Sequence, residues 1–252
     1  METIKELSKD LRLSYIRKNY EEHLQIAKQT NQDHEDFLQE LLLNERNQRR
    51  NNGIKRRIRL AKFPQKKYLE DFEVSHFKED IKKKFKELET LDFIESKENV
   101  ILMSNPGMGK THYASALGMK ACLENKKVLF ISVPNLIIEL KEAMSQNQIT
   151  RYKNQFERYD LVILDELGYV SFDKEGSEIL FNLISNRINA GSIIITTNLL
   201  FDRWEEIFKD PILTTAIVDR LAFKSHIINM SGDSYRIKET KNWLNKKSNS
   251  NA

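Results

Sequence analysis

A short run of small, flexible and basic residues has the types and spacing of a loop that binds phosphate. It comprises Ser104, Asn105, Pro106, Gly107, Met108, Gly109, Lys110, Thr111 and His112. Glycines let a backbone turn so that successive N–H groups point at phosphate oxygens. In this pattern the lysine reaches the β- and γ-phosphates, and the threonine hydroxyl binds Mg²⁺. These residues therefore predict a binding site for ATP and Mg²⁺.

The flanks of this loop have the patterns that such a loop requires. Residues 100–103 are continuously apolar and predict a buried strand, and residues 111–125 have a helical pattern. The helix N-terminus adds a partial positive charge. Ser104 stands where the pattern G-x-x-x-x-G-K-[ST] has its first glycine, and serine fits there if its φ stays negative. The alternative is a Gly/Pro turn with an accidental Lys-Thr, but the flanks favour a phosphate loop.

An acidic pair follows a second apolar run. Asp165 and Glu166 come directly after residues 161–164, which predict a strand. At the tip of that strand Asp165 would hold Mg²⁺, directly or through water. Glu166 would polarise a water molecule for attack on the γ-phosphate. An acidic pair after a strand is otherwise often a solvated loop, and the phosphate loop earlier in the chain favours the catalytic interpretation.

Three further polar residues are candidates for the same chemistry. Asn198 ends the predicted strand 192–197, where its amide would contact the γ-phosphate or orient the attacking water; the alternative is an Asx turn. Arg220 is a candidate arginine finger acting in a neighbouring subunit's site. Its alternative is a surface ion pair with Asp219. Arg236 is a weaker candidate for phosphate sensing, with a structural role as its alternative.

A basic segment precedes the phosphate loop. From Arg46 to Lys67 the chain contains no Asp or Glu. Uncompensated like charges repel one another unless a polyanion lies against them, so we predict contact with the backbone of duplex DNA, without base reading. The alternative is a solvated surface. The predicted DNA-binding residues are Arg46, Arg49, Arg50, Lys55, Arg56, Arg57, Arg59 and Lys62.

The elements that position these residues fall into two classes. Residues 3–62 show helical spacing of apolar residues and predict a small all-α domain, whereas strands and helices alternate after residue 99. Such alternation predicts an α/β fold with a parallel sheet flanked by helices, and ligands bind such sheets at the carboxyl ends of their strands. We predict a helical, basic DNA-binding region over 1–67, an ATPase domain over 68–245 and a disordered tail over 246–252.

Composition sets limits on the class of protein. The chain has 252 residues, 40% of them hydrophobic, and a formal net charge of +4, which permits a nucleic-acid partner without requiring one. The single cysteine, Cys122, predicts a buried, inert thiol. The N-terminus lacks the apolar region of a signal peptide, and no run approaches the length of a membrane span. These features predict a soluble, cytoplasmic protein without a membrane partner.

The order and spacing of these segments resemble the IstB family of AAA+ ATPases, which are transposition helper proteins related to DnaC-type helicase loaders. The resemblance covers nearly the whole chain. It implies a P-loop NTPase fold of the AAA+ type, a homo-oligomer with ATP at its subunit interfaces, and ATP-dependent assembly on duplex DNA with a partner transposase. The segments that carry it begin at Leu11, Phe37, Ala61, Leu69, Asn105, Leu164, Thr196, Trp204, Asp219 and Gly232.

Three other functions are compatible with parts of this pattern. A replicative helicase loader is the same enzyme class with another client. A non-hydrolysing, nucleotide-stabilised DNA scaffold is suggested only by Ser104, and Glu166 and Asn198 argue against it, because a scaffold needs neither. A small-molecule phosphotransferase would leave the basic segment without a purpose. The residues therefore favour an ATPase that assists DNA transposition.

Overall fold

The computed structural model describes residues 2–187 and 190–230. The chain divides into two compact units, Met1–Arg56 and Arg57–Ala252. Arg236 and the predicted tail 246–252 lie outside the described residues.

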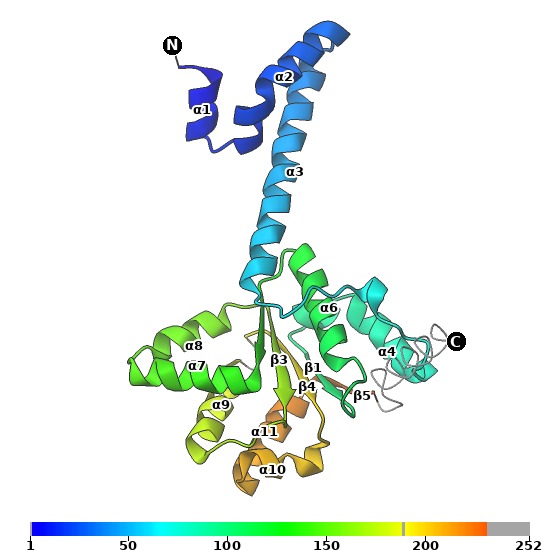
Figure 1. Cartoon of the computed structure of the whole chain (residues 1–252), viewed down its shortest axis with the longest axis vertical. Helices are drawn as coiled ribbons and strands as arrows, with labels where there is room; N and C mark the ends of the chain where they lie inside the picture. The colour runs from blue at the N-terminus through cyan, green and yellow to red at the C-terminus, as the bar shows by residue number, and fades with distance from the viewer. Residues whose placement is uncertain (1, 188–189, 231–252) are drawn as a thin grey trace, which may run out of the picture. The chain divides into compact units, whose positions relative to one another are not determined.

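The described part of the first unit is helical, which confirms the predicted all-α region. It contains α1 (Ile4–Asp10), α2 (Ser14–Thr30) and the beginning of α3 (His34–Leu60) (Figure 1). The backbone N–H of Glu35 donates to the carboxylate of Asp33 at 2.9 Å, so Asp33 caps the start of α3. Helix starts leave several N–H groups without intrahelical partners, and this cap satisfies one of them.

Glu45, only 3% exposed, connects α3 to the start of α2. Its carboxylate accepts hydrogen bonds from the backbone N–H groups of Ser14, Tyr15 and Ile16, at 3.2, 2.7 and 3.2 Å. Burial raises the pKa of Glu45, but these donors together with Arg49 outweigh burial and hold the pKa below its usual range. The N-terminus of α2 is thus capped by a charged side chain from another helix.

The described residues of the second unit form a five-stranded parallel sheet with the order β2-β3-β4-β1-β5, which confirms the predicted α/β fold. Because β4 lies between β1 and β3, the phosphate loop and the acidic pair come from strands that are not neighbours. The strands are β1 (Asn99–Met103), β2 (Val128–Ser132), β3 (Leu161–Leu167), β4 (Ser192–Thr197) and β5 (Ser225–Asn229).

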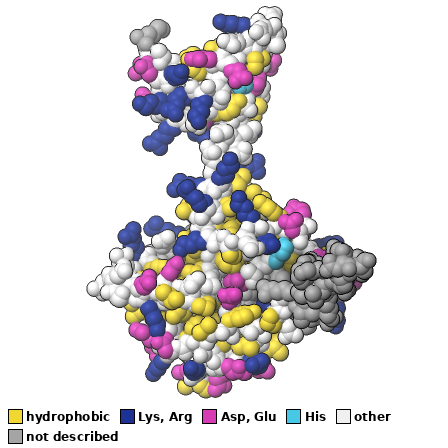
Figure 2. All heavy atoms as spheres, viewed as in Figure 1, with side chains coloured by type: hydrophobic (Ala, Val, Ile, Leu, Met, Phe, Trp, Pro, Cys, Tyr) yellow, Lys and Arg dark blue, Asp and Glu magenta, His cyan; other side chains and the backbone are white. Residues whose placement is uncertain are grey.

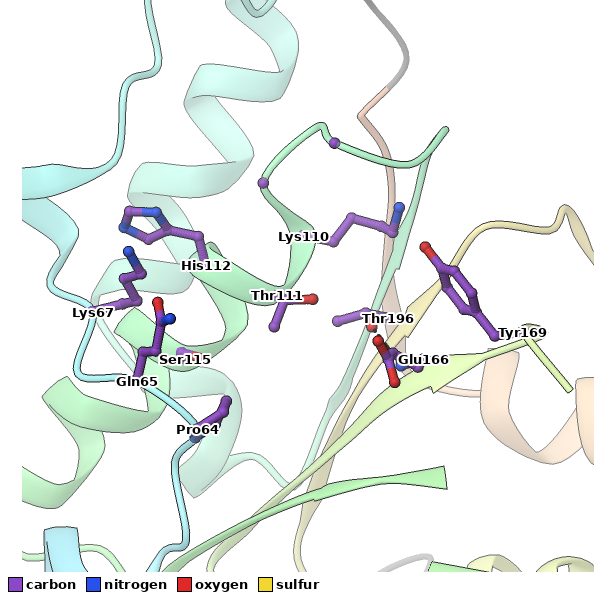
Figure 3. Close-up of a pocket in the computed structure, with 12 residues that line it drawn as sticks. Pro64, Gln65, Lys67, Lys110, Thr111, His112, Ser115, Glu166, Tyr169 and Thr196 are labelled. Carbon is purple, nitrogen blue, oxygen red and sulfur yellow. Dashed lines mark hydrogen bonds between the residues drawn. The ribbon is translucent and has the colours of Figure 1, made fainter. Parts of the chain in front are cut away.

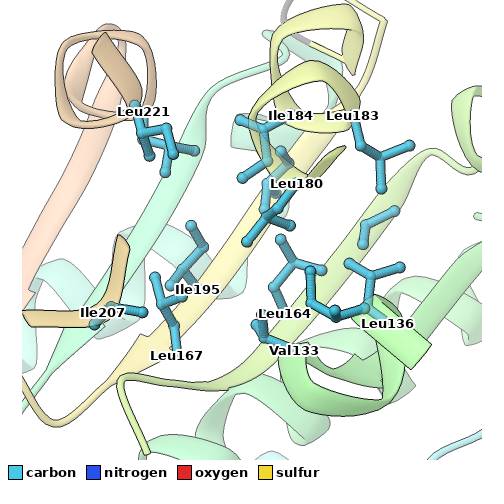
Figure 4. Close-up of a cluster of buried hydrophobic side chains, with 14 of the residues drawn as sticks. Val133, Leu136, Leu164, Leu167, Leu180, Leu183, Ile184, Ile195, Ile207 and Leu221 are labelled. Atoms are coloured by element: carbon cyan, nitrogen blue, oxygen red, sulfur yellow. The ribbon is translucent and has the colours of Figure 1, made fainter. Parts of the chain in front are cut away.

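Helices cover both faces of this sheet (Figure 1). Successive side chains of a strand point to opposite faces. Ile101 and Met103 accordingly belong to one core cluster, part of which is drawn in Figure 4, and Val100 and Leu102 belong to the other. The first face packs against α7 (Val133–Ser145), α8 (Ile149–Glu157), α9 (Lys174–Arg187), α10 (Glu205–Phe208) and α11 (Pro211–Ala222), and the second against α4 (Glu79–Glu89), α5 (Asp92–Glu95) and α6 (Lys110–Leu123).

The segment that follows α3 packs onto the second core cluster. Ala61 is fully buried, and its carbonyl accepts from the N–H of Phe130 at 2.7 Å. A Cβ on Gly118 would lie only 2.8 Å from the ring of Phe63, so this close approach requires glycine. Cys122 is buried and free, and burial raises its pKa to about 11, which confirms the predicted inert thiol.

Short 3₁₀ turns at Leu69–Asp71 (η1) and Phe201–Arg203 (η2) complete the described elements. Among the described helices, none is both long enough and apolar enough to cross a membrane.

Candidate nucleotide site and basic segment

The phosphate loop connects the end of β1 to the start of α6, as predicted. Gly107 and Gly109 have φ values of +88° and +85°, a region that side chains rarely adopt. A Cβ on Gly109 would also lie 2.9 Å from the ring of Phe72, so Gly109 is required by both conformation and space. Ser104 is not among the residues with positive φ, and serine therefore fits in place of the first glycine.

Lys110 lies inside the loop with only 6% of its surface exposed. Its ammonium donates to the carbonyl oxygens of Ser104 and Asn105, at 2.7 and 3.1 Å, and to the hydroxyl of Ser104 at 3.0 Å. The serine hydroxyl therefore adds a contact to Lys110 that a glycine could not make. Met108 is 1% exposed and belongs to the second core cluster, so its side chain anchors the loop to the core. Pro106, in the same loop, is exposed.

The acidic pair lies in a β-bulge at the end of β3. Leu164 pairs with Ile195 and Leu167 pairs with Thr197, so two residues of β3 oppose Thr196 alone. These two residues are Asp165 and Glu166. Asp165 is 5% exposed, whereas Glu166 is exposed and has a φ of +65°. The bulge therefore directs the two carboxylates into different environments.

A chain of hydrogen bonds links the start of α6 to the ends of β3 and β4. The Thr111 hydroxyl donates to Asp165 Oδ1 at 2.9 Å, and the Thr196 hydroxyl donates to the same oxygen. The N–H of Glu166 in turn donates to Thr196 Oγ1 at 3.0 Å. Thr196 thus links the acidic residue beside Thr111 to the backbone of Glu166. Sequence reasoning missed Thr196, because only the position of β4 between β1 and β3 reveals its place.

Thr111, Glu166 and Thr196 line one pocket of about 540 Å³, within the range of about 300–1,000 Å³ that small-molecule sites occupy (Figure 3). Lys110 and Thr111 face Glu166 and Thr196 across it, which brings together the phosphate loop and the acidic pair as predicted. The other lining residues come from the segment after α3, from α6 and from the β3–α9 loop. The full lining is Pro64, Gln65, Lys67, Gly107, Gly109, Lys110, Thr111, His112, Ser115, Glu166, Tyr169 and Thr196.

His112 lines this pocket from the first turn of α6. Its ring contacts the edge of Phe72, with 5.5 Å between ring centroids. Burial lowers the pKa of His112, although the backbone carbonyl of Tyr68 partly offsets this, so the imidazole is neutral at pH 7. A neutral ring is compatible with contact with the edge of a nucleotide, and this contact stays a prediction.

Two other predicted site residues lie away from the pocket lining. Asn198 has a buried Oδ1 without a partner among the described residues, and a Cβ on Gly168 would stand 2.8 Å from it. Arg220 packs over the ring of Phe181, with 4.7 Å from guanidinium carbon to ring centroid, and donates to the carbonyl of Ala216 at 3.1 Å. Their contacts with a γ-phosphate stay predictions.

The basic residues of the predicted DNA-binding set differ in their surroundings. Three have partners in their own unit: Arg49 donates to Glu45, Arg57 donates to the carbonyl of Cys122 at 2.9 Å, and Lys62 pairs with Glu139 at 3.1 Å. The others are exposed, without a hydrogen bond or ion pair among the described residues, and Figure 2 shows Lys and Arg side chains along this stretch. They are Arg46, Arg50, Lys55, Arg56 and Arg59.

Comparisons with known proteins agree with this geometry. The model of the family described as IstB-like ATP binding protein matches residues 6–242. An insertion sequence IS21 putative ATP-binding protein from Pseudomonas aeruginosa is 37% identical, over 95% of this chain and 90% of the relative. The putative ATP-binding protein of insertion sequence IS5376 from Geobacillus stearothermophilus is 33% identical, over 94% and 95% of the two chains.

Solved structures show the same fold. DnaA from Aquifex aeolicus has a TM-score of 0.56 at 19% identity, over 73% of this chain and 56% of that one. DnaI has a TM-score of 0.54 at 18% identity, over 67% and 89%. The parallel sheet with its flanking helices thus has the fold of these solved structures, and the chain belongs to the IstB-like ATP-binding protein family.

Proposed function

We propose that this protein binds ATP with Mg²⁺ in the pocket, hydrolyses it, and uses the cycle to assemble on duplex DNA and assist a transposase. The observation that carries the proposal is the convergence of four side chains from two non-adjacent strand ends. Lys110 and Thr111 lie on one side of the pocket, with Asp165 bonded to Thr111 and Glu166 facing them.

The residues beside the loop fit a magnesium ion. Thr111 Oγ1 and Asp165 Oδ1 lie 2.9 Å apart, and Mg²⁺ prefers hydroxyl, carboxylate and phosphate oxygens. When bound, the ion neutralises charge on the β- and γ-phosphates. The Lys110 ammonium would exchange its loop carbonyls for phosphate oxygens, which are stronger acceptors because they are charged.

Hydrolysis needs a group that orients water and accepts its proton. The exposed Glu166 carboxylate is suited to this role, because it lies in the pocket opposite the phosphate loop. Water oxygen would bond to the γ-phosphorus, the bond to the β–γ bridging oxygen would break, and the water proton would pass to Glu166. Arg220 lies away from this pocket, so we propose that it acts in the site of a neighbouring subunit.

The basic segment supports a DNA role. Five of the predicted DNA-binding residues are exposed without intramolecular partners among the described residues, so their charges are available to phosphates. The names of the relatives favour transposition over helicase loading, since both relatives above are named for insertion sequences.

The test is a steady-state ATPase assay with and without duplex DNA. We expect Mg²⁺-dependent release of phosphate that duplex DNA stimulates. Binding of ATP without turnover, in the presence and absence of DNA, would instead support the non-hydrolysing scaffold. Failure to bind ATP at all would overturn the proposal.

A further inference from the structure

Tyr169 is a residue of the pocket to which the proposed chemistry gives no role. It lies in the loop between β3 and α9, and half of its surface, 50%, is exposed. Figure 3 shows its ring directed from this loop toward the phosphate loop, with the hydroxyl at the end nearest Lys110. A phenol hydroxyl that lines a polar pocket can donate a hydrogen bond to a ligand bound there.

A tight turn at Gly168 precedes Tyr169 and directs its side chain toward the pocket. Gly168 has a φ of +106°, and a Cβ there would lie 2.8 Å from Asn198 Oδ1 and 3.1 Å from the side chain of Leu199. The N–H of Tyr169 points back to the carbonyl of Glu166 at 3.4 Å. Conformation and space therefore both require glycine at position 168, and the tight turn that results places Tyr169 above the bulge.

We propose that the Tyr169 hydroxyl binds the γ-phosphate and so distinguishes a nucleoside triphosphate from a diphosphate. This inference rests on the proposed function. The hydroxyl of a phenol donates a hydrogen bond to a phosphate oxygen. Donors to charged groups form the stronger class of hydrogen bonds.

The distribution of charged and polar side chains around the pocket places the γ-phosphate on the same side as Tyr169. Lys67, Gln65 and His112 lie together at one side in Figure 3, whereas Lys110, Glu166 and Tyr169 lie at the other. The γ-phosphate belongs at the second side, because Lys110 holds it and Glu166 activates water for it. Thr196 is 1% exposed and its hydroxyl is already bonded to Asp165 and Glu166, so it is a poor donor to the ligand. The Glu166 carboxylate and the γ-phosphate are both negatively charged and repel each other. The Tyr169 hydroxyl, a neutral donor beside Glu166, would offset this repulsion by donating a hydrogen bond to the phosphate.

The experiment compares the affinities of Mg²⁺-AMPPNP and Mg²⁺-ADP by isothermal titration calorimetry. Tyr169→Phe keeps the ring and removes the hydroxyl. Tyr68→Phe is the matched control, because Tyr68 is similarly exposed, 42%, and does not line this pocket. We expect Tyr169→Phe to weaken AMPPNP binding about tenfold, the effect of one hydrogen bond to a charged group, and to leave ADP binding unchanged.

The outcomes separate this inference from the proposed function. If Tyr169→Phe weakened the binding of both nucleotides equally, or of neither, the γ-phosphate contact would be overturned. Binding of AMPPNP by the wild-type chain would still support the proposed ATP site. If the wild-type chain bound neither nucleotide, both proposals would fail. Tyr169→Ala tests whether the ring contributes by stacking alone. In that case Tyr169→Ala would weaken the binding of both nucleotides, whereas Tyr169→Phe would weaken the binding of neither.

Discussion

Replacing Thr196 with valine would test the link between the two halves of the site. Valine has nearly the size and shape of threonine, so packing at the end of β4 is kept and only the hydroxyl is lost. Two bonds disappear with it: the N–H of Glu166 loses an acceptor that lies 3.0 Å away, and Asp165 loses one of its two hydroxyl donors. The bond from Thr111 to Asp165 remains.

The size of the effect follows from these bonds. A buried group left without its partner costs about 1–3 kcal/mol. Thr196→Val leaves two groups short of a partner, the Glu166 N–H and the Asp165 carboxylate, but the exposed Glu166 admits water to its N–H. We therefore expect the free energy of unfolding to fall by about 2 kcal/mol, the lower end of the range for two such groups. Glu166 also keeps a φ of +65°, which costs roughly 1–3 kcal/mol and persists only where neighbours hold it. Without Thr196 it should relax and move its carboxylate, and a misplacement of about 1 Å costs about 10²-fold in rate.

The assays are urea unfolding followed by circular dichroism, and steady-state ATP hydrolysis. We expect Thr196→Val to lower kcat strongly with little change in KM, because the phosphate loop is untouched. Thr196→Ser keeps the hydroxyl and should stay close to wild type in both assays. A valine variant as stable and as active as wild type would refute the linking role, and equal losses in Val and Ser would assign the effect to packing.

Two further predictions concern the basic segment and Arg220. Replacing Arg56 and Arg59 with alanine should weaken binding of all duplex sequences in anisotropy titrations, and the slope of log affinity against log salt should fall by about 0.9 per lost phosphate contact. Arg57→Ala should instead lower the free energy of unfolding by about 1 kcal/mol, because Arg57 is bonded to the Cys122 carbonyl. An unchanged slope in the double variant would make the segment a solvated surface. Arg220→Ala should keep ATP affinity and lose hydrolysis, and mixing it with Lys110→Ala should restore part of the activity; mixed oligomers that form and stay inactive would rule out action between subunits.

The features that could be predicted from sequence are those fixed by local patterns. Continuous apolar runs identified β1 and β3, and the glycines with Lys110 identified the loop between β1 and α6. Asp165 and Glu166 could be assigned to the site because they directly follow one of those runs. Each of these inferences needs only residues that are close together in the chain.

The features that could not be predicted depend on contacts between distant segments. Thr196 enters the site because β4 lies between β1 and β3 and because a bulge sets two acidic residues against it. The charge run likewise does not reveal that Arg57 bonds to the carbonyl of Cys122 or that Lys62 pairs with Glu139. Strand order and side-chain partners of this kind are set by the packed sheet and its helices, beyond the reach of spacing alone.

The central claim, that one pocket both binds ATP and hydrolyses it, is tested most directly by separating its two halves. The measurement is ATP affinity and phosphate release for Glu166→Gln and Lys110→Ala side by side. We predict that Glu166→Gln binds Mg²⁺-ATP as wild type does while its turnover falls by about 10²–10⁴-fold, and that Lys110→Ala loses binding. Turnover at the wild-type rate in Glu166→Gln, or equal loss of binding in both variants, would contradict this account.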